Sequence, residues 1–585
     1  MPPSTVLATG AVWTSSESLT IPSTDILSFV FANLDQYDND KPIFIDAADP
    51  TNSISARRAF HVTRRLIKGL KDLGLQEGDC VCVHAFNNIW YPLIWLAIIG
   101  SGACVSGTNP ACNASELVRH FRLTKPKFIF AQGHCIQGVM QAASACHIPV
   151  SNIFVVDLPK QTPPVDGCRT WWTLLVNGEN DWSGPSDDDD DASVNERIAV
   201  YSMTSGTTGL PKAAMIPHRS IVTQSTLLER QFDARSYEPS QLICLPVFHA
   251  FALPLALVLP LRLGIQTYFL PRFVLQDFLQ AVDTHEITDT PLVPPIIAAL
   301  NQLPHAQRHL LRSLRYVICA GAPMPASVQT EVYKVLSKSA VVAQCWGTTE
   351  AGWHTLFDWN VKDTSGSVGR LLPNVQMRLV DVGGVNVGQD GQLGEALIKS
   401  PTLFTGYLGN PDKTRDAFDS DGFYRTGDRV SVLDDKVFYE GRIKEVMKVK
   451  GWQVAPQELE TVLMKHPQIS DVAVVGITRD DGLGLPETLP CAYVVRAPVA
   501  FAAESSGDAV AGEVGRNSPL TAKAVQQLVA AKLISYKRLT GGVVFVKQIP
   551  RSATGKILRH RLSEMELDVP NGVEAAPADT EQYPV

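Results

Sequence analysis

Helix-like and strand-like patterns alternate along most of the chain, and this alternation limits the possible folds more than any other feature of the sequence. Residues 55–74 carry apolar side chains at the spacing of one helix face, and Gly74 is suited to ending that helix. A short apolar run typical of a strand begins at Cys80, and similar runs occur at residues 128–131, 153–156, 242–247 and 316–319. This order of elements predicts an α/β fold of layered sheets and helices, with much of the sheet parallel.

The chain length and a change in character near the C-terminus predict two domains. At 585 residues the chain is too long for one ordinary domain. At residues 441–445 the sequence GRIKE leads into KVKGWQVAPQELE, which is typical of a turn and a short helix. We expect a large N-terminal α/β domain over residues 20–440 and a small, mobile α+β domain over residues 441–565. The smaller domain would end in a helix at residues 555–565, and residues 566–585 would form a tail.

Two segments of biased composition predict surface loops. Residues 183–193 contain five consecutive aspartates, which repel one another and favour a solvated loop over a metal site. Residues 499–519 are rich in Ala, Gly and Ser and lack periodicity, which is typical of a disordered loop.

Composition disfavours several other classes of protein. The 51 basic and 59 acidic residues give a formal net charge of −8, which argues against broad nucleic-acid binding and against attachment to anionic membranes. The 11 cysteines include no CxxC pair, so neither a zinc site nor a disulfide framework is indicated. No secretory signal, membrane-spanning stretch or peroxisomal tripeptide is visible, so we expect a reduced, cytoplasmic location.

The segment from Tyr201 to Lys212, YSMTSGTTGLPK, carries the strongest chemical signal. Its backbone N–H groups and hydroxyls can surround phosphate oxygens, while Lys212 adds a positive charge. The residues of this predicted phosphate loop are Thr204, Ser205, Gly206, Thr207, Thr208, Gly209 and Lys212. The spacing is not that of a Walker A loop, which needs glycine directly before the lysine, and SATGKI at residues 552–557 fails on spacing as well.

TSGTTGLPK resembles the phosphate-binding signature of the adenylate-forming superfamily, which includes acyl-CoA synthetases, nonribosomal peptide adenylation domains and beetle luciferases. Further motifs resemble that family's signatures in the same order, namely AGAPM at 320–324, QCWGTTEAG at 344–352, YRTGD at 424–428, GRIKEVMKVKG at 441–451 and PRSATGKILR at 550–559. The likeness to coumarate–CoA ligases implies an enzyme that joins a carboxylic acid to AMP, releases pyrophosphate and transfers the acyl group to coenzyme A.

The resemblance also implies a role in adenylation for each matched residue. The positions that would bind the adenine end of ATP are Gly321, Ala322, Pro323, Trp346, Gly347 and Thr348. Thr349 would contact the α-phosphate, and Glu350 would ligate Mg²⁺. Asp428, assisted by Arg442, would bind the ribose hydroxyls. Lys556 would bridge the substrate carboxylate and the α-phosphate.

Thioester formation requires a second arrangement of the same site. By resemblance, the small domain would rotate about a hinge at Lys444, and Lys448, Lys450 and Gly451 would then serve the CoA reaction. PVFHAF at residues 246–251 resembles the segment beside the acyl pocket, so His249 would orient the carboxylate; a core histidine is the alternative.

The nature of the acid follows only in outline. Amino-acid-activating relatives carry an aspartate where this chain has His249, which disfavours an α-amino acid. Cys345 replaces a usual glycine on the pocket wall and predicts a reshaped pocket. The resemblance implies an aromatic or medium-chain acid as substrate. CoA is the favoured acceptor, and a stand-alone adenylating enzyme that loads a carrier protein or another acceptor is the alternative.

Overall fold

The computed structural model describes residues 6–9, 12–157, 167–182, 196–204, 212–233, 235–449, 452–480, 486–497, 520–552, 555–559 and 561–562. The chain divides into two compact units. The first consists of residues 1–426 and 430–439, and the second of residues 427–429 and 440–585. The division at residue 441 that the sequence suggests remains a prediction, and the two units are described separately below. The predicted loops at 183–193 and 499–519 lie outside the described residues, as do residues 563–585.

An eight-stranded sheet in the first unit carries the element that precedes the predicted phosphate loop. Its order is β22-β11-β10-β6-β5-β7-β8-β9. The strands are β5 (Cys80–His84), β6 (Cys104–Gly107), β7 (Phe128–Ala131), β8 (Ile153–Val155), β9 (Arg169–Thr170), β10 (Ile198–Thr204), β11 (Lys212–Pro217) and β22 (Gly406–Tyr407). The strands from β10 to β9 run parallel, whereas β11 is antiparallel to both β10 and β22.

The helices of this part agree with the predicted α/β pattern. Ser55 caps the first turn of α2 (Ala56–Asp72), whose apolar residues Val62, Leu66 and Leu70 are buried. Helix α3 (Tyr91–Gly100) is buried along its whole length, as expected of a core helix that leads into a turn. Helices α4 (Ala114–Thr124) and α5 (Ile136–Ala145) follow. Among the helices that the structure describes, none has both the length and the apolar content needed to cross a bilayer.

A nine-stranded sheet in the first unit carries the second group of predicted site residues. Its order is β18-β17-β16-β15-β14-β12-β13-β3-β4. The strands are β3 (Pro42–Asp46), β4 (Ser53–Ser55), β12 (Ser240–Ile243), β13 (Gln266–Phe269), β14 (Asp289–Leu292), β15 (Tyr316–Cys319), β16 (Val341–Thr348), β17 (Gly352–Leu356) and β18 (Arg370–Leu371). The associated helices include α7 (His218–Asp233), α9 (Leu275–Thr284), α10 (Pro294–Asn301) and α11 (Ala326–Val332).

The strand predicted at residues 242–247 is wrong from Cys244 onward, because β12 ends at Ile243. Beyond that point the backbone bonds to a side chain rather than to a neighbouring strand. The Asn87 amide donates to the Leu245 carbonyl at 2.9 Å, and its oxygen accepts from the Val247 N–H at 3.1 Å. One buried asparagine thus takes the place of the strand ladder.

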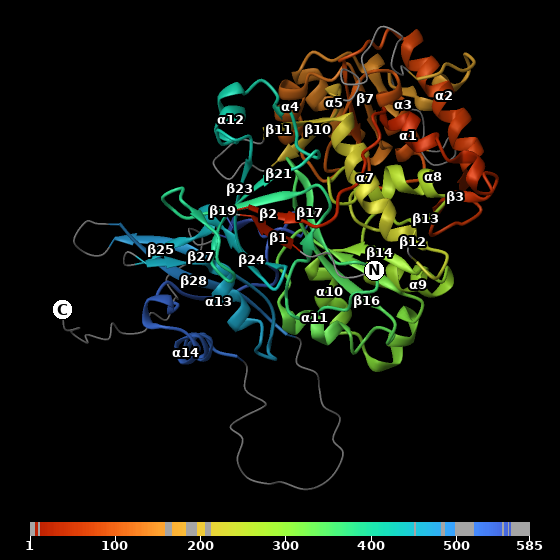
Figure 1. Ribbon diagram of the computed structural model, residues 1–585. Coiled ribbons are helices and arrows are strands. Elements are labelled where there is room, and N and C mark those ends of the chain that lie inside the picture. Colours follow the sequence, from red (N-terminus) through yellow and green to blue (C-terminus); the bar gives the residue numbers. More distant parts are fainter. Residues whose placement is uncertain are drawn as a thin grey trace. The chain divides into compact units, whose positions relative to one another are not determined.

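A third sheet pairs the N-terminal segment with strands far along the chain. Strand β2 (Val12–Ser15) lies between β1 (Val6–Thr9) and β19 (Gln376–Val380), as Figure 1 shows. The order continues through β21 (Gly394–Lys399) to β23 (Tyr424–Leu433) and β24 (Lys436–Arg442), and β20 (Asn386–Val387) pairs with β19.

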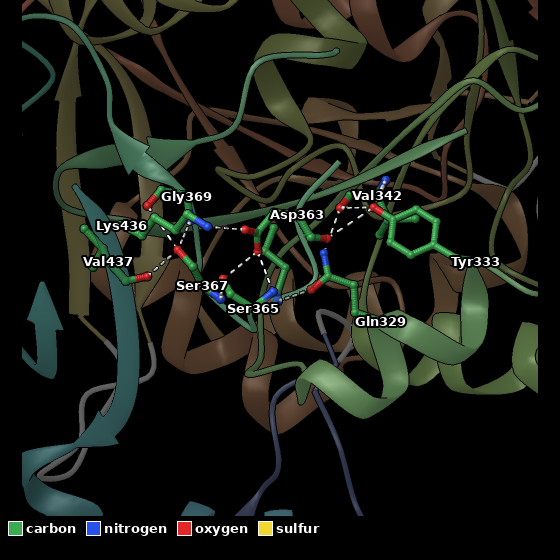
Figure 2. Close-up of polar contacts among 10 residues, drawn as sticks. Gln329, Tyr333, Val342, Asp363, Ser365, Ser367, Gly369, Lys436 and Val437 are labelled. Carbon is green, nitrogen blue, oxygen red and sulfur yellow. Dashed lines mark hydrogen bonds and ion pairs between the residues drawn. The ribbon is translucent and has the colours of Figure 1, made fainter. Parts of the chain in front are cut away.

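A polar network in the first unit holds the start of β24 (Figure 2). Lys436 Nζ donates to Asp363 Oδ1 at 2.8 Å, and the other Asp363 oxygen accepts from the backbone N–H and the hydroxyl of Ser365. The Ser367 hydroxyl donates to the Val437 carbonyl at 2.8 Å. Since the Asp363 residue is only 6% exposed, these contacts satisfy a carboxylate that burial would otherwise destabilise.

The same network reaches the strand that precedes the predicted nucleotide-binding segment. The Tyr333 hydroxyl accepts from the Val342 N–H of β16 at 3.1 Å and lies 3.5 Å from the Asp363 carbonyl. Gln329 on α11 donates to the Val342 carbonyl and accepts from the buried Gln344 side chain. The segment around Asp363 is therefore connected by hydrogen bonds to both β16 and β24.

The second unit is built on the three-stranded sheet β27-β28-β29. Strands β27 (Ile469–Asp480) and β28 (Pro486–Arg496) are antiparallel, and β29 (Gly542–Phe545) runs parallel to β28. One apolar cluster includes residues of α13 (Pro456–Leu463) and α14 (Ala522–Lys532), and a second contains Ile549 and Leu562. Before α13, the short strands β25 (Met447–Val449) and β26 (Trp452–Val454) pair where the sequence predicted only a turn.

The helix predicted at residues 555–565 does not begin at Gly555. Arg551 and Ile557 form an isolated bridge, and Gly555 has a left-handed φ of 78°. Side chains also take the backbone groups that a helix would need. The Ser552 hydroxyl accepts from the Lys556 N–H, and the Arg551 guanidinium donates to the Gly555 carbonyl. Helical geometry among the described residues appears only from Arg559.

Candidate active site

The predicted phosphate loop is bounded by two paired strands. Thr204 ends β10 and lies opposite Lys212, which begins the antiparallel strand β11. The intervening Ser205, Gly206, Thr207, Thr208 and Gly209 lie outside the described residues. The structure thus fixes the two ends of this segment on adjacent strands of the eight-stranded sheet.

Lys212 and Glu350 both contact Tyr407. The Lys212 Nζ lies 3.9 Å from the centre of the Tyr407 ring, within the range of a cation–π interaction. The Tyr407 hydroxyl donates to Glu350 Oε1 at 2.9 Å. Tyr407 is 6% exposed and Glu350 is 8% exposed, so the carboxylate is held in a largely dry environment. Tyr407 is not indicated by the sequence, since no local pattern links β22 to residues more than 50 positions away.

The segment from Trp346 to Glu350 turns tightly between β16 and β17. The pairing shifts register between Trp346 and Gly347. A Cβ atom on Gly347 would lie 2.4 Å from the Gly352 carbonyl oxygen, so no other residue fits without a backbone shift. Thr348 is buried and Thr349 is half-buried on the same turn. The predicted residues of this segment therefore lie together at one edge of the nine-stranded sheet.

A buried histidine packs beneath the predicted adenine-stacking ring. The His354 ring meets Trp346 edge-on, with 4.6 Å between the ring centres, and its Nε2 lies 3.4 Å from the Thr348 hydroxyl. Burial lowers the pKa of His354 to about 3, so the imidazole is neutral near pH 7. A neutral ring supports Trp346 without placing a positive charge under it.

Gly321, Ala322 and Pro323 follow the neighbouring strand. Strand β15 ends at Cys319 and runs parallel to β16, with Cys319 opposite Gln344. Gly321 has a φ of 91°, which favours glycine as the chain leaves the strand. Because adjacent parallel strands end at the same edge of a sheet, this segment and Trp346 share that edge.

His249 lies in a turn near an aromatic pair. Its Nδ1 accepts a hydrogen bond from the Phe251 N–H at 3.3 Å, which assigns the proton of the neutral ring to Nε2. The Phe251 ring lies 5.2 Å from that of Trp353, which lies on β17. His249 is half-buried rather than enclosed in the core.

The second unit contains the remaining predicted residues. Arg442 Nε lies 3.1 Å from Asp428 Oδ1, and Asp428 is 2% exposed. The two residues predicted to bind the ribose, Asp428 and Arg442, therefore lie in contact.

The predicted lysines lie elsewhere in the second unit. Lys556 lies in the turn closed by Ser552, and Lys444 is exposed in a short 3-10 turn at Ile443–Glu445. Lys448 lies on β25 opposite Gln453, whereas Lys450 and Gly451 lie outside the described residues.

Comparison with known proteins identifies the family. A sequence profile described as AMP-binding enzyme matches residues 30–408, and one described as AMP-binding enzyme C-terminal domain matches residues 458–556. The chain belongs to the AMP-binding enzyme family. Its full-length likeness to curated members is consistent with this assignment. The acyl-CoA ligase azaF of Aspergillus niger is 38% identical, with 93% of this chain and 99% of that relative covered.

Two further proteins resemble the chain over a similar share of its length. The phenylacetyl-CoA ligase epaB of Aspergillus niger is 38% identical, with 94% of this chain and 98% of that relative covered. The ATP-bound structure of MatB from Rhodopseudomonas palustris has a TM-score of 0.76 and 24% identity, with 92% of this chain and 99% of that chain covered. That structure supports the predicted fold. The predicted activity is also confirmed: this AMP-binding enzyme is an ATP-dependent acid–CoA ligase that works through an acyl-AMP.

The described residues of this AMP-binding enzyme fit a metal held jointly with a nucleotide. They contain no group of three or more His, Cys, Asp or Glu side chains arranged to hold a metal ion. Mg²⁺ commonly uses one or two protein carboxylates together with substrate phosphates and water. Glu350 would be the carboxylate that holds such a metal. Its Oε1 accepts from Tyr407, whose strand β22 pairs with the strand that begins with Lys212.

Cys345 is not suited to act as a nucleophile. Burial, and then the neighbouring Cys319, raise the pKa of its thiol well above the ordinary range. Cys345 is 6% exposed and lies on β16 opposite Leu356. Its thiol therefore contributes volume rather than a reactive thiolate.

Proposed function

We propose that this ligase activates an aromatic or medium-chain carboxylic acid with Mg²⁺ and ATP and transfers the acyl group to CoA. The observation that carries the proposal is the meeting of Lys212 and Glu350 at Tyr407. A cation and a carboxylate fixed beside a predicted phosphate loop can bind a triphosphate and its metal together.

The phosphate end of the nucleotide is assigned to the first unit. Lys212, with the hydroxyl of Thr204 and the predicted loop between them, would bind the phosphates, and Thr349 would contact the α-phosphate. Glu350 would hold Mg²⁺, which when bound neutralises charge on the phosphates. These assignments are supported by the burial of Glu350 and by the pairing of Thr204 with Lys212.

The adenosine end is assigned to residues at one edge of the nine-stranded sheet and to the buried Asp428. Trp346 would stack on adenine, with His354 packed against its ring, and residues 321–323 and Gly347–Thr348 would border the base. Asp428, paired with Arg442, would accept hydrogen bonds from the ribose hydroxyls. A carboxylate that is held by a guanidinium has a fixed orientation for such contacts.

The reaction proceeds in two displacements. A carboxylate oxygen attacks the α-phosphorus, the bond to the β-phosphate oxygen breaks, and pyrophosphate leaves with its electron pair. Lys556 would stabilise the negative charge shared by the carboxylate and the α-phosphate. The CoA sulfur then attacks the acyl carbon, AMP leaves, and the thiol proton is lost to solvent. Lys448, Lys450 and Gly451 would serve this second step, after rotation of the small domain at Lys444.

The class of acid is supported by the residues near His249. Phe251 and Trp353 present two aromatic rings 5.2 Å apart, which suits contact with a flat or apolar acyl group. His249, with its Nε2 protonated when neutral, can donate to a carboxylate and lacks the negative charge that would hold an α-ammonium. The relative named as a phenylacetyl-CoA ligase supports the aromatic option.

The test is pyrophosphate release across a panel of acids, with and without CoA, followed by mass spectrometry. The panel includes phenylacetate, benzoate, nicotinate, hexanoate, octanoate and several α-amino acids. We expect release with aromatic or medium-chain acids and an acyl-CoA product. Release that yields only acyl-AMP would favour the carrier-loading alternative, and release driven only by amino acids or short acids would overturn the proposed substrate class.

A further inference from the structure

Tyr407 is held beside Lys212 by the backbone of two antiparallel strands. In the register of β22 and β11, Tyr407 lies opposite Ala214, which shares a face with Lys212 two residues before it. The Thr405 N–H donates to the Met215 carbonyl at 3.0 Å, and the Leu408 N–H donates to the Ala213 carbonyl at 2.9 Å. The distance of 3.9 Å between the lysine nitrogen and the ring centre thus follows from strand pairing.

The same short segment also holds Glu350. The Phe404 N–H donates to the Glu350 backbone carbonyl at 2.8 Å, and the Tyr407 hydroxyl donates to Glu350 Oε1 at 2.9 Å. The Tyr407 N–H donates to the Thr414 hydroxyl, and the Tyr407 ring packs edge-on against Phe404. Both the backbone and the side chain of Glu350 are therefore oriented by residues 404–407.

A single phenol thus separates a cation from a carboxylate and contacts both. Its ring face attracts the ammonium of Lys212, while its hydroxyl satisfies one oxygen of the nearly buried Glu350. A leucine or phenylalanine in its place would fill much of the same space. Packing alone therefore does not require tyrosine, whereas orienting a metal-binding carboxylate requires the hydroxyl.

We propose that Tyr407 is a positioning residue that sets Glu350 for the metal and Lys212 for the phosphates of the same nucleotide. The proposal rests on the proposed function of the site. It separates two contributions of one side chain, because the hydroxyl acts on the metal-binding carboxylate and the ring acts on the lysine. Two substitutions at one position can therefore distinguish these contributions.

The experiment compares Tyr407→Phe and Tyr407→Leu with the wild type. Mn²⁺ binding in the presence of ATP is followed by the electron paramagnetic resonance signal of free Mn²⁺, and ATP binding without divalent metal is followed by calorimetry in EDTA. For Tyr407→Phe we expect Mn²⁺ affinity to fall about tenfold, since a hydrogen bond to a charged group is lost, with metal-free ATP affinity unchanged. For Tyr407→Leu we expect both affinities to fall.

A packing control separates positioning from general loosening. Phe418 stacks on Phe404 in the same aromatic cluster, with 5.6 Å between the ring centres. In the described part of the chain it forms no hydrogen bond or cation–π contact with Glu350 or Lys212. Phe418→Leu should lower the melting temperature and leave the Mn²⁺ affinity unchanged. An equal loss of Mn²⁺ affinity in Phe418→Leu and Tyr407→Phe, or no loss in Tyr407→Phe, overturns the proposal.

These readouts do not depend on turnover. If the wild type released no pyrophosphate with any acid but bound Mn²⁺ with ATP, the proposed substrate class would fail while the binding series still decided the role of Tyr407. Suppose instead that the wild type releases pyrophosphate with an acid of the panel, and that Tyr407→Phe matches it in Mn²⁺ affinity and in the Mg²⁺ dependence of the rate. Only the proposal for Tyr407 would then fail.

Discussion

Lys436 Nζ and Asp363 Oδ1 lie 2.8 Å apart in the first unit, although 73 positions separate the residues in the sequence. Asp363 is almost fully buried, while the Lys436 side chain is 28% exposed. The pair fixes the first residues of β24, four positions before the second unit resumes at Glu440. The predicted hinge at Lys444 therefore follows a strand whose start is firmly held.

We expect Lys436→Met to lower the free energy of unfolding of the first unit by about 2 kcal/mol. The substitution leaves the Asp363 charge without its cation, and the partial exposure of Lys436 places the cost below that of a fully buried pair. Urea denaturation followed by tryptophan fluorescence measures the change. Lys334→Met, which removes an exposed pair with Glu331, is the matched control and should change little. A double variant with Asp363→Asn, whose side-chain oxygen can still accept from Ser365, should regain part of the loss, and no recovery would contradict the pairing argument.

Much of the fold was predictable because its signals are local. The apolar spacing of α2 and the uniformly apolar runs of β7, β8 and β15 report buried helix and strand faces directly. The errors occurred where distant or side-chain bonds replace a regular pattern. Asn87 ends β12, and Arg551 with Ser552 prevents a helix at Gly555, and neither effect can be seen in the pattern of the replaced segment.

The candidate site was predictable only as far as its motifs extend. Resemblance indicated Trp346, Glu350, Asp428 and Lys556, but their assigned roles remain predictions. Tyr407 was missed because its contacts depend on the pairing of β22 with β11, which are nearly 200 residues apart. His354 was missed because it appears as an ordinary core residue until its contact with Trp346 is seen.

Lys556→Ala should lower acyl-AMP formation by about a hundredfold or more, since a charge that stabilises the first displacement is lost. Thioester formation from preformed acyl-AMP should persist. Lys448→Ala should have the opposite pattern. Each half-reaction is measured separately, by pyrophosphate release and by acyl-CoA production. Lys523→Ala, an exposed lysine on α14, is the control. Equal loss of both half-reactions in Lys556→Ala would refute the role assigned to it.

Three buried histidines should make the fold less stable in mild acid. Burial lowers the pKa of His84 and of His120 to about 4 and that of His354 to about 3. Since these values lie below the value of the unfolded chain, the unfolded state binds more protons as the pH falls. The contribution of each neutral histidine to the free energy of unfolding is fully present above pH ~6.5. It decreases as the pH falls, by about 1 kcal/mol for each histidine by pH ~5.5.

His120→Gln tests this dependence because glutamine can still bond to Ser106, the partner of His120 Nε2. Urea midpoints measured between pH 7.5 and about 5.5 should fall less steeply for the variant than for the wild type. The exposed His305 provides the control, since His305→Gln should leave the slope as it was. An unchanged slope in His120→Gln would show that this residue does not remain neutral in the folded protein.

Cys345→Gly should shift the acid preference toward bulkier acyl groups, because it removes a side chain from the predicted pocket wall. The ratio of kcat/KM for a bulky acid to that for a small acid should rise about tenfold, the effect of roughly one methylene-sized group. Cys345→Ala, which keeps the Cβ atom, should give a smaller change without adding backbone freedom to β16. If the ranking of the acid panel is the same in all three proteins, Cys345 does not line the pocket.

The ion pairs of Arg559 have a consequence for the order of folding. Arg559, three residues after Lys556, binds Glu445 at 3.0 Å and Glu460 at 2.5 Å, across 114 and 99 positions of the sequence. Contacts between such distant residues form after local ones, because the intervening chain must first be ordered. The strands β27 and β28 lie within that interval, so the loop that carries Lys556 becomes fixed only once the sheet beneath it exists. The proposed catalytic lysine is therefore secured by a late step in the folding of the second unit.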